Sequence, residues 1–218
     1  MDRLVADGHS VRVVDNFVVD SRRNLAHHDG NPDVQVIEAD IRDAEALEPV
    51  FQGADRVFHL AARADIVPSI VEPKEYFTTN VDGIFNVLEA SKRAGVKRLT
   101  YVASSTCYGI PDAYPTREDA EVRPQFPYAL TKHIGEELVL HWGKIYDLPV
   151  MVLRFFNVYG PRARTSGTYG AVFGVFLAQK IAEKPFTIVG DGNQTRDFVY
   201  VTDVADAFVR AADSDVTG

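Results

Sequence analysis

Residues 10–17 read SVRVVDNF, a short run of β-branched residues that ends in an acid. Similar runs recur along the chain, and most are continuously apolar, as expected of strands that helices cover on both faces. Longer stretches of helical pattern lie between them. This alternation predicts an α/β fold with a doubly wound, mostly parallel sheet. The predicted strands span 11–17, 34–40, 56–62, 98–105 and 150–157, and the two main predicted helices span 74–94 and 128–146.

The chain changes character after residue 160, where Gly and Arg replace the apolar runs. The elements predicted there are a loop at 160–170, a helix at 171–183, two short strands around a turn within 185–201, and a capped helix from 202 onward. We therefore divide the chain into a first domain, residues 1–160, and part of a smaller lobe, residues 161–218. The lobe is expected to interleave with the end of the first domain.

The first residues, 2–8, are predicted to be the last turns of a helix that Gly8 ends. No strand precedes them, yet the first strand of a doubly wound sheet lies near its centre. The loss of that strand would expose the edges of its neighbours. We therefore expect a sheet that lacks its first strand. A fold that simply begins with a helix is the alternative.

Asp15 ends the first predicted strand and is a candidate for binding a ribose. In dinucleotide-binding sheets an acid at this point follows a glycine-rich phosphate loop by about 20 residues. Counting back that far from Asp15 leads to a point before Met1. Asp15 is therefore either a ribose ligand whose loop lies outside these residues, or an ordinary acid at a strand end.

Composition excludes several classes of protein. The net charge of −8 over 218 residues opposes binding to nucleic acid. The one cysteine, Cys107, excludes an internal disulfide framework and suits a reducing cytoplasm. No apolar run approaches the roughly 18 residues of a membrane span. The histidines and acids show no metal-site spacing, so we predict no metal ligand.

Tyr128 and Lys132 are candidate catalytic residues because their spacing of four places them on one face of a helix. A nearby ammonium favours the tyrosinate and is expected to lower the pKa of Tyr128, which makes it a base for a hydroxyl group. The stretch 103–109, ASSTCYG, follows a predicted strand and offers hydroxyls for a proton relay. The alternatives are a solvated Tyr–Lys pair and a serine-rich turn that binds its own backbone.

Several motifs together resemble the extended short-chain dehydrogenase/reductases, which have a Rossmann-like fold. Within them the chain is most similar to the NAD-dependent epimerase/dehydratase family and its 4-epimerases of the UDP-glucose and UDP-N-acetylglucosamine type. The family's G-x-x-G-x-x-G loop and first strand would lie before Met1, and its members continue past Gly218. The resemblance thus implies a chain incomplete at both ends. The motifs are VVDNF (13–17), EADIRD (38–43), HLAA (59–62), NVDGIFNVLEA (80–90), ASSTCYG (103–109), PYALTK (127–132), LRFFNVYGP (153–161) and GDGNQTRDFVYVTDV (190–204).

The resemblance implies a role for each motif residue. Three side chains would be catalytic: Ser104, Tyr128 and Lys132. The cofactor would be NAD, in contact with Asp15, Asn16, Asp40, Ile41, Leu60, Ala61, Ala62, Asn80, Tyr128, Lys132 and Phe156. The substrate would be a nucleotide sugar of the UDP-sugar type, in contact with Ser69, Ser104, Asn157 and Arg196.

The reaction implied is oxidation and re-reduction at C4 of the sugar. Related dehydratases and decarboxylases add an acid to the serine motif, where this chain has Ser105 and Thr106, and this difference favours an epimerase. Arg162 and Arg164 either pair with a uronate or face solvent. Family members commonly form homodimers through the helices that correspond to 74–94 and 128–146. A truncated relative that binds a nucleotide sugar or a protein without catalysis is the competing hypothesis.

Overall fold

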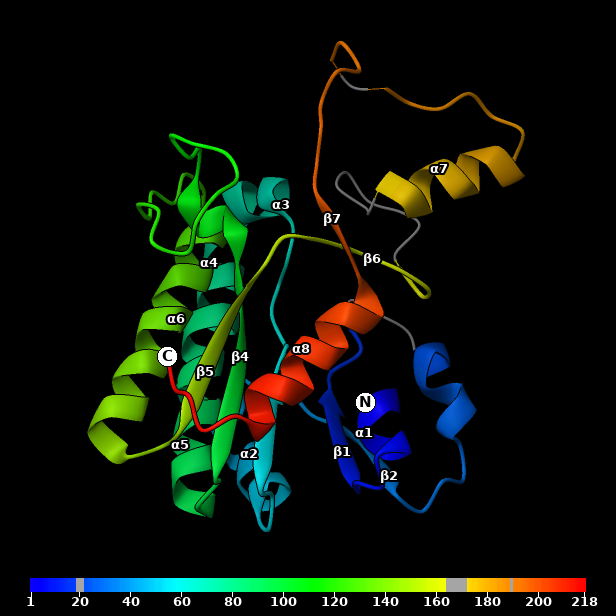
Figure 1. The fold of residues 1–218 in the computed structure, drawn as a ribbon. Coiled ribbons are helices and arrows are strands. Elements are labelled where there is room, and N and C mark those ends of the chain that lie inside the picture. Colours follow the sequence, from blue (N-terminus) through cyan, green and yellow to red (C-terminus); the bar gives the residue numbers. More distant parts are fainter. Residues whose placement is uncertain (19–21, 164–171, 189) are drawn as a thin grey trace.

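The computed structural model describes residues 1–18, 22–163, 172–188 and 190–218. Every strand pair in these residues is parallel (Figure 1). The strands are β1 (Val11–Asp15), β2 (Val34–Glu38), β3 (Arg56–His59), β4 (Arg98–Ser104), β5 (Val150–Phe155), β6 (Asn157–Tyr159) and β7 (Phe198–Tyr200). The α-helices are α1 (Asp2–Ala6), α2 (Ala44–Phe51), α3 (Ile66–Val71), α4 (Pro73–Phe77), α5 (Gly83–Ala94), α6 (Pro127–Tyr146), α7 (Val172–Ile181) and α8 (Val201–Asp213).

The strands form three sheets with the orders β1-β2, β3-β4-β5 and β6-β7. All five strands predicted for the first domain are present, shortened by one to three residues at their carboxyl ends. Within the described residues no strand pairs with both β1 and β3, so the single sheet that the sequence predicts is divided there. Val14 of β1 and Val57 of β3 nevertheless pack against the same core.

Helices cover both faces of the three-stranded sheet. Phe58 packs against Phe208 of α8, with ring centroids 6.1 Å apart, whereas His59 stacks on Tyr101 at 5.6 Å, on the side of α6. Because successive side chains of a strand point to opposite faces, α8 and α6 lie on opposite sides of the sheet. This is the layering of a doubly wound fold, and Figure 1 shows α8 crossing the sheet.

The core lies between the sheet and the helices α2, α5 and α6. In α5 the buried residues Ile84, Val87, Leu88 and Ser91 follow the spacing of one helix face. Gly95 ends this helix in a left-handed conformation, with φ of 68°, as the sequence predicts. The buried cluster also contains Ile41, Leu47, Phe51, Ala90, Val96, Leu99, Tyr101, Ala103, Val139, Leu148 and Val150.

The continuous helix predicted at 74–94 is wrong in its middle. The segment consists of α4, a π-helical turn at Thr78–Asp82 and then α5. A π-turn inserts one residue into the helical repeat and is frequent at functional sites. Here it carries Asn80, whose side chain reaches back to the segment that follows β3.

The smaller lobe also departs from prediction. Of its two predicted strands, the described residues form one, β7, which pairs with β6. Phe186 and Ile188 lie outside any strand and are exposed. The last helix begins at Val201 after Tyr200 and has no side-chain cap, so the predicted cap is wrong. The predicted helix start at Ala171 lies outside the described residues.

The last residues return to the first domain. The Val152 N–H donates to the carbonyl of Gly218 at 2.7 Å, and the Gly218 N–H donates to the carbonyl of Val150 at 3.1 Å. Residues 201–218 therefore pack on the first domain, while α7 and β7 form an arm (Figure 1). None of the helices in the described ranges is both long enough and apolar enough to cross a bilayer.

Candidate active site

Ser104 and Tyr128 come together at the carboxyl end of β4. Ser104 is the last residue of that strand and is almost fully buried. Its Oγ accepts a hydrogen bond from the Thr106 hydroxyl at 2.9 Å. The Ser104 side chain also acts on the phenol of Tyr128, where it opposes the rise in pKa that burial causes. The fold thus places the serine motif and the tyrosine of α6 at the same end of the sheet.

Ser69 fixes the start of α6. The Tyr128 N–H is one of the helix-terminal donors that no residue within the helix can satisfy. It donates to Ser69 Oγ at 3.1 Å, and Ser69 in turn donates to the Ile66 carbonyl at 2.5 Å. Ser69 is fully buried. The residue predicted to face the substrate is thus engaged in holding the backbone of Tyr128.

The electrostatic setting of Tyr128 differs from the prediction. Burial raises the pKa of its phenol, the hydrogen bond from Ser104 opposes this rise, and the charge of Asp65 adds to it. The expected lowering of the pKa of Tyr128 by Lys132 is wrong. The reason is geometric, because the Lys132 ammonium lies over the ring of Tyr101, with Nζ 4.4 Å from the ring centroid.

Lys132 is buried, with 3% of its surface exposed. Removal from water penalises the charged amine and lowers the pKa of Lys132 to about 7. A buried amine with a pKa of about 7, one helical turn along α6 from a buried phenol, is an arrangement suited to moving protons. The geometry thus supports acid–base chemistry at the carboxyl end of the sheet.

Comparisons with known proteins agree with this geometry. The profile of the NAD dependent epimerase/dehydratase family matches residues 1–218. The chain is 38% identical to the UDP-glucose 4-epimerase of Mycolicibacterium smegmatis over 97% of this chain and 68% of that protein.

The chain belongs to the NAD-dependent epimerase/dehydratase family.

Two further relatives show the range of this family. The structure of UDP-N-acetylglucosamine 4-epimerase from Methanobrevibacter ruminantium M1, in complex with UDP-N-acetylmuramic acid, matches with a TM-score of 0.95 and 34% identity, over 100% of this chain and 69% of that one. UDP-glucuronic acid decarboxylase 4 of Arabidopsis thaliana is 34% identical over 100% of this chain and 48% of its own length. The chain thus spans between half and about two thirds of these relatives.

The residues assigned to the adenosine end of NAD converge at the ends of β1 and β2. Asn16 Nδ2 donates to Asp40 Oδ2 at 2.9 Å. Asp15 Oδ1 accepts from the Phe17 N–H at 2.7 Å, and the side chain of Asp15 is exposed. The guanidinium of Arg42 hydrogen-bonds to Asp40 and holds the pKa of that carboxyl well below its usual range. This edge therefore presents the carboxylates of Asp15 and Asp40.

The small residues after β3 occupy different environments. Leu60 is 58% exposed, so it is no core residue, whereas Ala61 packs against the core. Ala62 is half-buried. Ile41 is itself a core residue, and its carbonyl accepts from Asn86 at 3.0 Å. Leu60 and Ala62 remain accessible to a ligand.

Asn80 is fully engaged within the protein. Its Nδ2 donates to the Arg63 carbonyl and to Thr131 Oγ1, both at 3.0 Å, and its Oδ1 accepts from the Arg63 N–H at 2.8 Å. Thr131 in turn donates to the Tyr128 carbonyl at 2.9 Å. The predicted cofactor ligand thus ties the segment after β3 to the helix that carries Tyr128.

The family cofactor fits part of this site. Asp15, Asn16 and Asp40 would hold the adenosine end, and Tyr128 and Lys132 would adjoin the nicotinamide end. NAD supplies a hydride acceptor and donor when bound. In such sites the backbone amides of a G-x-x-G-x-x-G loop bind the pyrophosphate, and residues 1–218 contain no such stretch.

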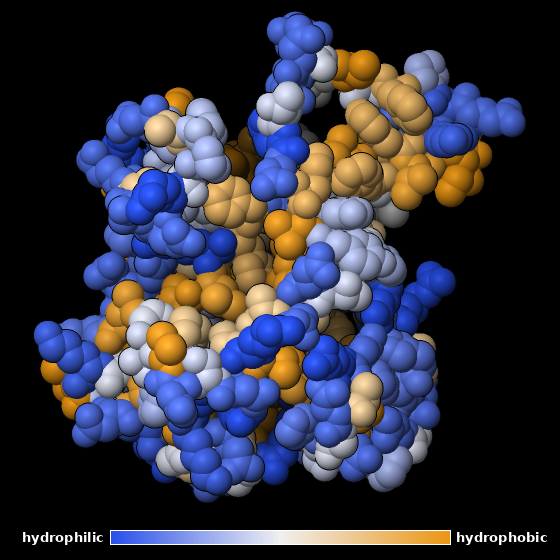
Figure 2. Space-filling model, in the orientation of Figure 1, coloured by the Kyte–Doolittle hydropathy of each residue, from blue (hydrophilic) through white to orange (hydrophobic). Residues whose placement is uncertain are grey.

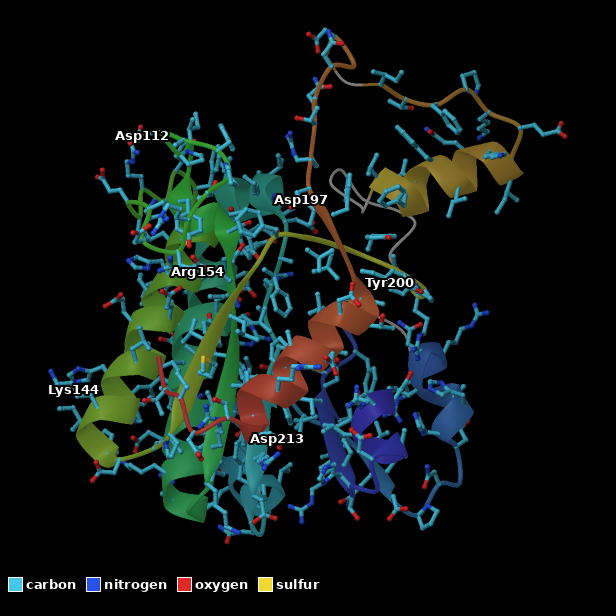
Figure 3. All side chains as sticks on the ribbon, viewed as in Figure 1. Asp112, Lys144, Arg154, Asp197, Tyr200 and Asp213 are labelled. Carbon is cyan, nitrogen blue, oxygen red and sulfur yellow. The ribbon has the colours of Figure 1, made fainter. Side chains whose placement is uncertain are left out.

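Phe156, expected to contact the cofactor, lies toward the arm, as do Asn157 and Arg196, which are expected to contact the substrate. Phe156 is 42% exposed and stacks on Tyr108, with centroids 6.5 Å apart. Asn157 Nδ2 donates to the Asp197 carbonyl at 3.0 Å, and Arg196 donates to the neighbouring Thr195 carbonyl at 2.7 Å. Figure 2 shows a recess with apolar side chains between the arm and the first domain, and Figure 3 shows Asp197 and Tyr200 along the arm.

Arg162, expected either to pair with a uronate or to face solvent, has partners within the protein. Its guanidinium donates to Asp2 Oδ2 at 2.6 Å and to the Asn24 carbonyl at 3.1 Å. Arg162 therefore ties the chain after β6 to the N-terminal helix. Arg164, the second candidate for a uronate contact, lies outside the described residues.

The sequence interpretation missed Asp65 as a residue of the site. Its φ of 83° is in the left-handed region, which an aspartate adopts at an energetic cost, and such residues cluster at functional sites. Its half-buried carboxylate acts on both Tyr76 and Tyr128, whose pKa values it raises. No local motif marks it, since both tyrosines meet it only through the fold.

Two groups of described side chains could hold a metal ion by distance alone. In the first, Asp2 is already bound by Arg162, and in the second, Glu136 is bound by Arg154. A guanidinium on a ligating carboxylate opposes a second cation, so we assign no metal to either group. The groups are Asp2, His27 and His28, and His133, Glu136 and Glu137.

His59 makes the protein sensitive to acid. Burial, assisted by the Lys132 charge, lowers the pKa of His59 to about 3 from 6.5. The unfolded chain takes up a proton below pH 6.5 whereas the folded chain does not, so the contribution of His59 to stability is lost as pH falls from 6.5 towards 3. We expect His59→Gln to flatten the fall in unfolding free energy over this window, measured by urea denaturation. His9→Gln, at an exposed position, is the control, and equal slopes for the two variants would contradict the assignment.

Proposed function

We propose that this chain is a NAD-dependent nucleotide-sugar 4-epimerase, which oxidises C4 of the sugar and reduces it again on the opposite face. The observation that carries the proposal is the convergence of Ser104, the last residue of β4, and Tyr128, at the start of α6. Lys132 lies one turn further along α6. Membership of the family and the likeness to two 4-epimerases support it.

Tyr128 exchanges the proton of the C4 hydroxyl in the proposed reaction. Its buried phenol has a raised pKa, so it holds its proton at neutral pH in this structure and needs help to release it. The hydrogen bond from Ser104 acts in that direction. Ser104 also places a second hydroxyl beside the reacting oxygen and so orients the C4 hydroxyl.

An epimerase is favoured over a dehydratase because Ser105 and Thr106 occupy the positions where the related dehydratases carry an acid. Removal of water from C5 and C6 needs an acid–base pair beside the sugar, and hydroxyls do not provide it. Asp65 favours the second candidate, a 4,6-dehydratase or decarboxylase, since its carboxylate is near enough to act on the phenol of Tyr128. The likeness to a UDP-glucuronic acid decarboxylase also points this way.

Mass spectrometry of the product separates these functions. The chain is incubated with millimolar NAD and a panel of UDP-sugars, and proton NMR then reads the configuration at C4. We expect a product of unchanged mass and inverted C4. A product that has lost water identifies a dehydratase, and one that has lost carbon dioxide identifies a decarboxylase. Unaltered sugars throughout the panel would favour a non-catalytic binding protein.

The proposal also covers the substrate, the domains, the oligomeric state and the cellular location. The substrate is a UDP-sugar, in line with the names of the relatives. Residues 1–160 form the dinucleotide-binding domain and residues 161–218 part of the substrate lobe. The chain forms a homodimer through α5 and α6, a placement that the exposed Phe85 and Leu130 on these helices support. We place it in the cytoplasm, in keeping with its one free cysteine.

A further inference from the structure

Lys132 has an aromatic partner that the proposed reaction does not use. Its Nζ lies 4.4 Å from the centroid of the Tyr101 ring, and the two side chains come from α6 and β4. Tyr101 is 1% exposed and Lys132 is 3% exposed. An ammonium over an aromatic face is attracted by the ring quadrupole, and the attraction is strongest where water is excluded.

The Tyr101 ring is held in place from several directions. Its hydroxyl donates to the Lys132 carbonyl at 3.4 Å, and His59 stacks on it at an interplanar angle of 13°. Gly135 is the position on α6 where the phenol meets the helix, because a Cβ there would come within 2.4 Å of the Tyr101 hydroxyl. The Tyr101 ring thus has a fixed position beneath the Lys132 amine.

Each titratable group around the Tyr101 ring is either uncharged or already paired with another residue. His59 is neutral over the physiological range because its pKa falls to about 3. Glu136, one turn after Lys132 on α6, is held by Arg154 in a bidentate ion pair. Tyr128, one turn before Lys132, keeps its proton because its pKa is raised.

We propose that Tyr101 is a positioning residue for Lys132: the face of its ring holds the ammonium at a set place beside Tyr128 and stabilises the charged form of the buried amine. The consequence for turnover rests on the proposed epimerase function, whereas the contact itself does not. Tyr101 acts through Lys132 and touches neither the sugar nor the reacting atoms.

The test replaces the ring without changing its shape. Tyr101→Phe keeps the aromatic face, and a trifluorinated phenylalanine at position 101 keeps the volume but weakens the quadrupole. Lysines carry a ¹⁵Nζ label, Lys132→Met assigns the signal, and the Lys132 midpoint is followed by NMR against pH. We expect the Phe variant to match the wild type. We expect the fluorinated variant to titrate about one pH unit lower.

The chain contains a matched control. Lys92 Nζ lies 4.3 Å from the centroid of the Tyr146 ring, but Tyr146 is 45% exposed and Lys92 also pairs with Glu89. The same fluorinated residue at position 146 should leave the Lys92 midpoint within a few tenths of a unit, since water screens the contact. Equal Lys132 midpoints in the Phe and fluorinated variants at position 101 would overturn the proposal.

A second measurement separates this proposal from the proposed function. The NMR titration needs neither NAD nor turnover. If the midpoint shifts as expected but no sugar is converted, the positioning role stands and the epimerase function fails. If sugar is converted, the fluorinated variant at position 101 should shift the pH profile of kcat by the same amount as the Lys132 midpoint. A change in kcat without a shift in that profile would indicate a merely structural role and would overturn the proposal.

Discussion

Tyr128→Phe is expected to lower kcat for 4-epimerisation about a thousandfold, the typical contribution of a positioned acid–base group. The change removes one oxygen, the group that hydrogen-bonds to Ser104. The start of α6 should be preserved, because Ser69 and Thr131 bind the backbone N–H and carbonyl of Tyr128 and not its phenol. The loss therefore reports on proton transfer and not on folding.

The assay follows UDP-sugar conversion by NMR at millimolar NAD, with circular dichroism as a check on the fold. Tyr146→Phe is the matched control, since Tyr146 lies on the same helix and is exposed. It should retain the wild-type rate. Turnover in Tyr128→Phe close to that of Tyr146→Phe would show that another group is the base.

Glu136→Gln is expected to lower the free energy of unfolding by about 3 kcal/mol, because it leaves the charge of a buried pair without its partner. Arg154 binds Glu136 through two hydrogen bonds, Nε–Oε2 at 3.0 Å and Nη2–Oε1 at 2.5 Å. The side chains are 21% and 6% exposed, respectively. Arg154 also donates to the Tyr108 hydroxyl at 2.7 Å, so the pair joins β5, α6 and the segment after β4.

Urea denaturation measures this loss. The control is Asp55→Asn, which breaks an ion pair with Lys97 whose side chains are 68% and 77% exposed, respectively. Water screens that pair, so its loss should lower the free energy of unfolding far less than the Glu136 substitution does. The prediction is wrong if the two substitutions cost the same.

Local sequence was sufficient for most of the first domain. The continuous apolar runs identified β1 to β5, because a strand buried on both faces needs apolar residues at nearly every position. Gly95 and Pro127 marked a helix end and a helix start, because each satisfies a backbone requirement within one turn. The positions of Ser104 and Tyr128 followed from motifs, and the fold brought them together as expected.

Local sequence does not show which distant residues a side chain or strand will meet. The stretch after residue 184 has the composition of a strand, yet among its described residues only β7 pairs with a neighbour, namely β6. Ser69 and Asn80 are predicted ligands, and the motifs do not show that their hydrogen-bonding atoms contact Tyr128, Arg63 and Thr131. A motif identifies the type of residue, but it does not show which atoms that side chain contacts in the folded protein.

The sequence by itself determined the order of strands and helices, the family, and the phenol, amine and hydroxyl that the chemistry requires. Only the tertiary structure decided where the amine of Lys132 lies and how Tyr128 titrates. Helical spacing limits Lys132 to one face of α6. The group beneath its ammonium is the ring of Tyr101, on which His59 stacks, and these two residues come from two strands. Burial and distant charges set the pKa of a side chain, and neither exists until the chain has folded.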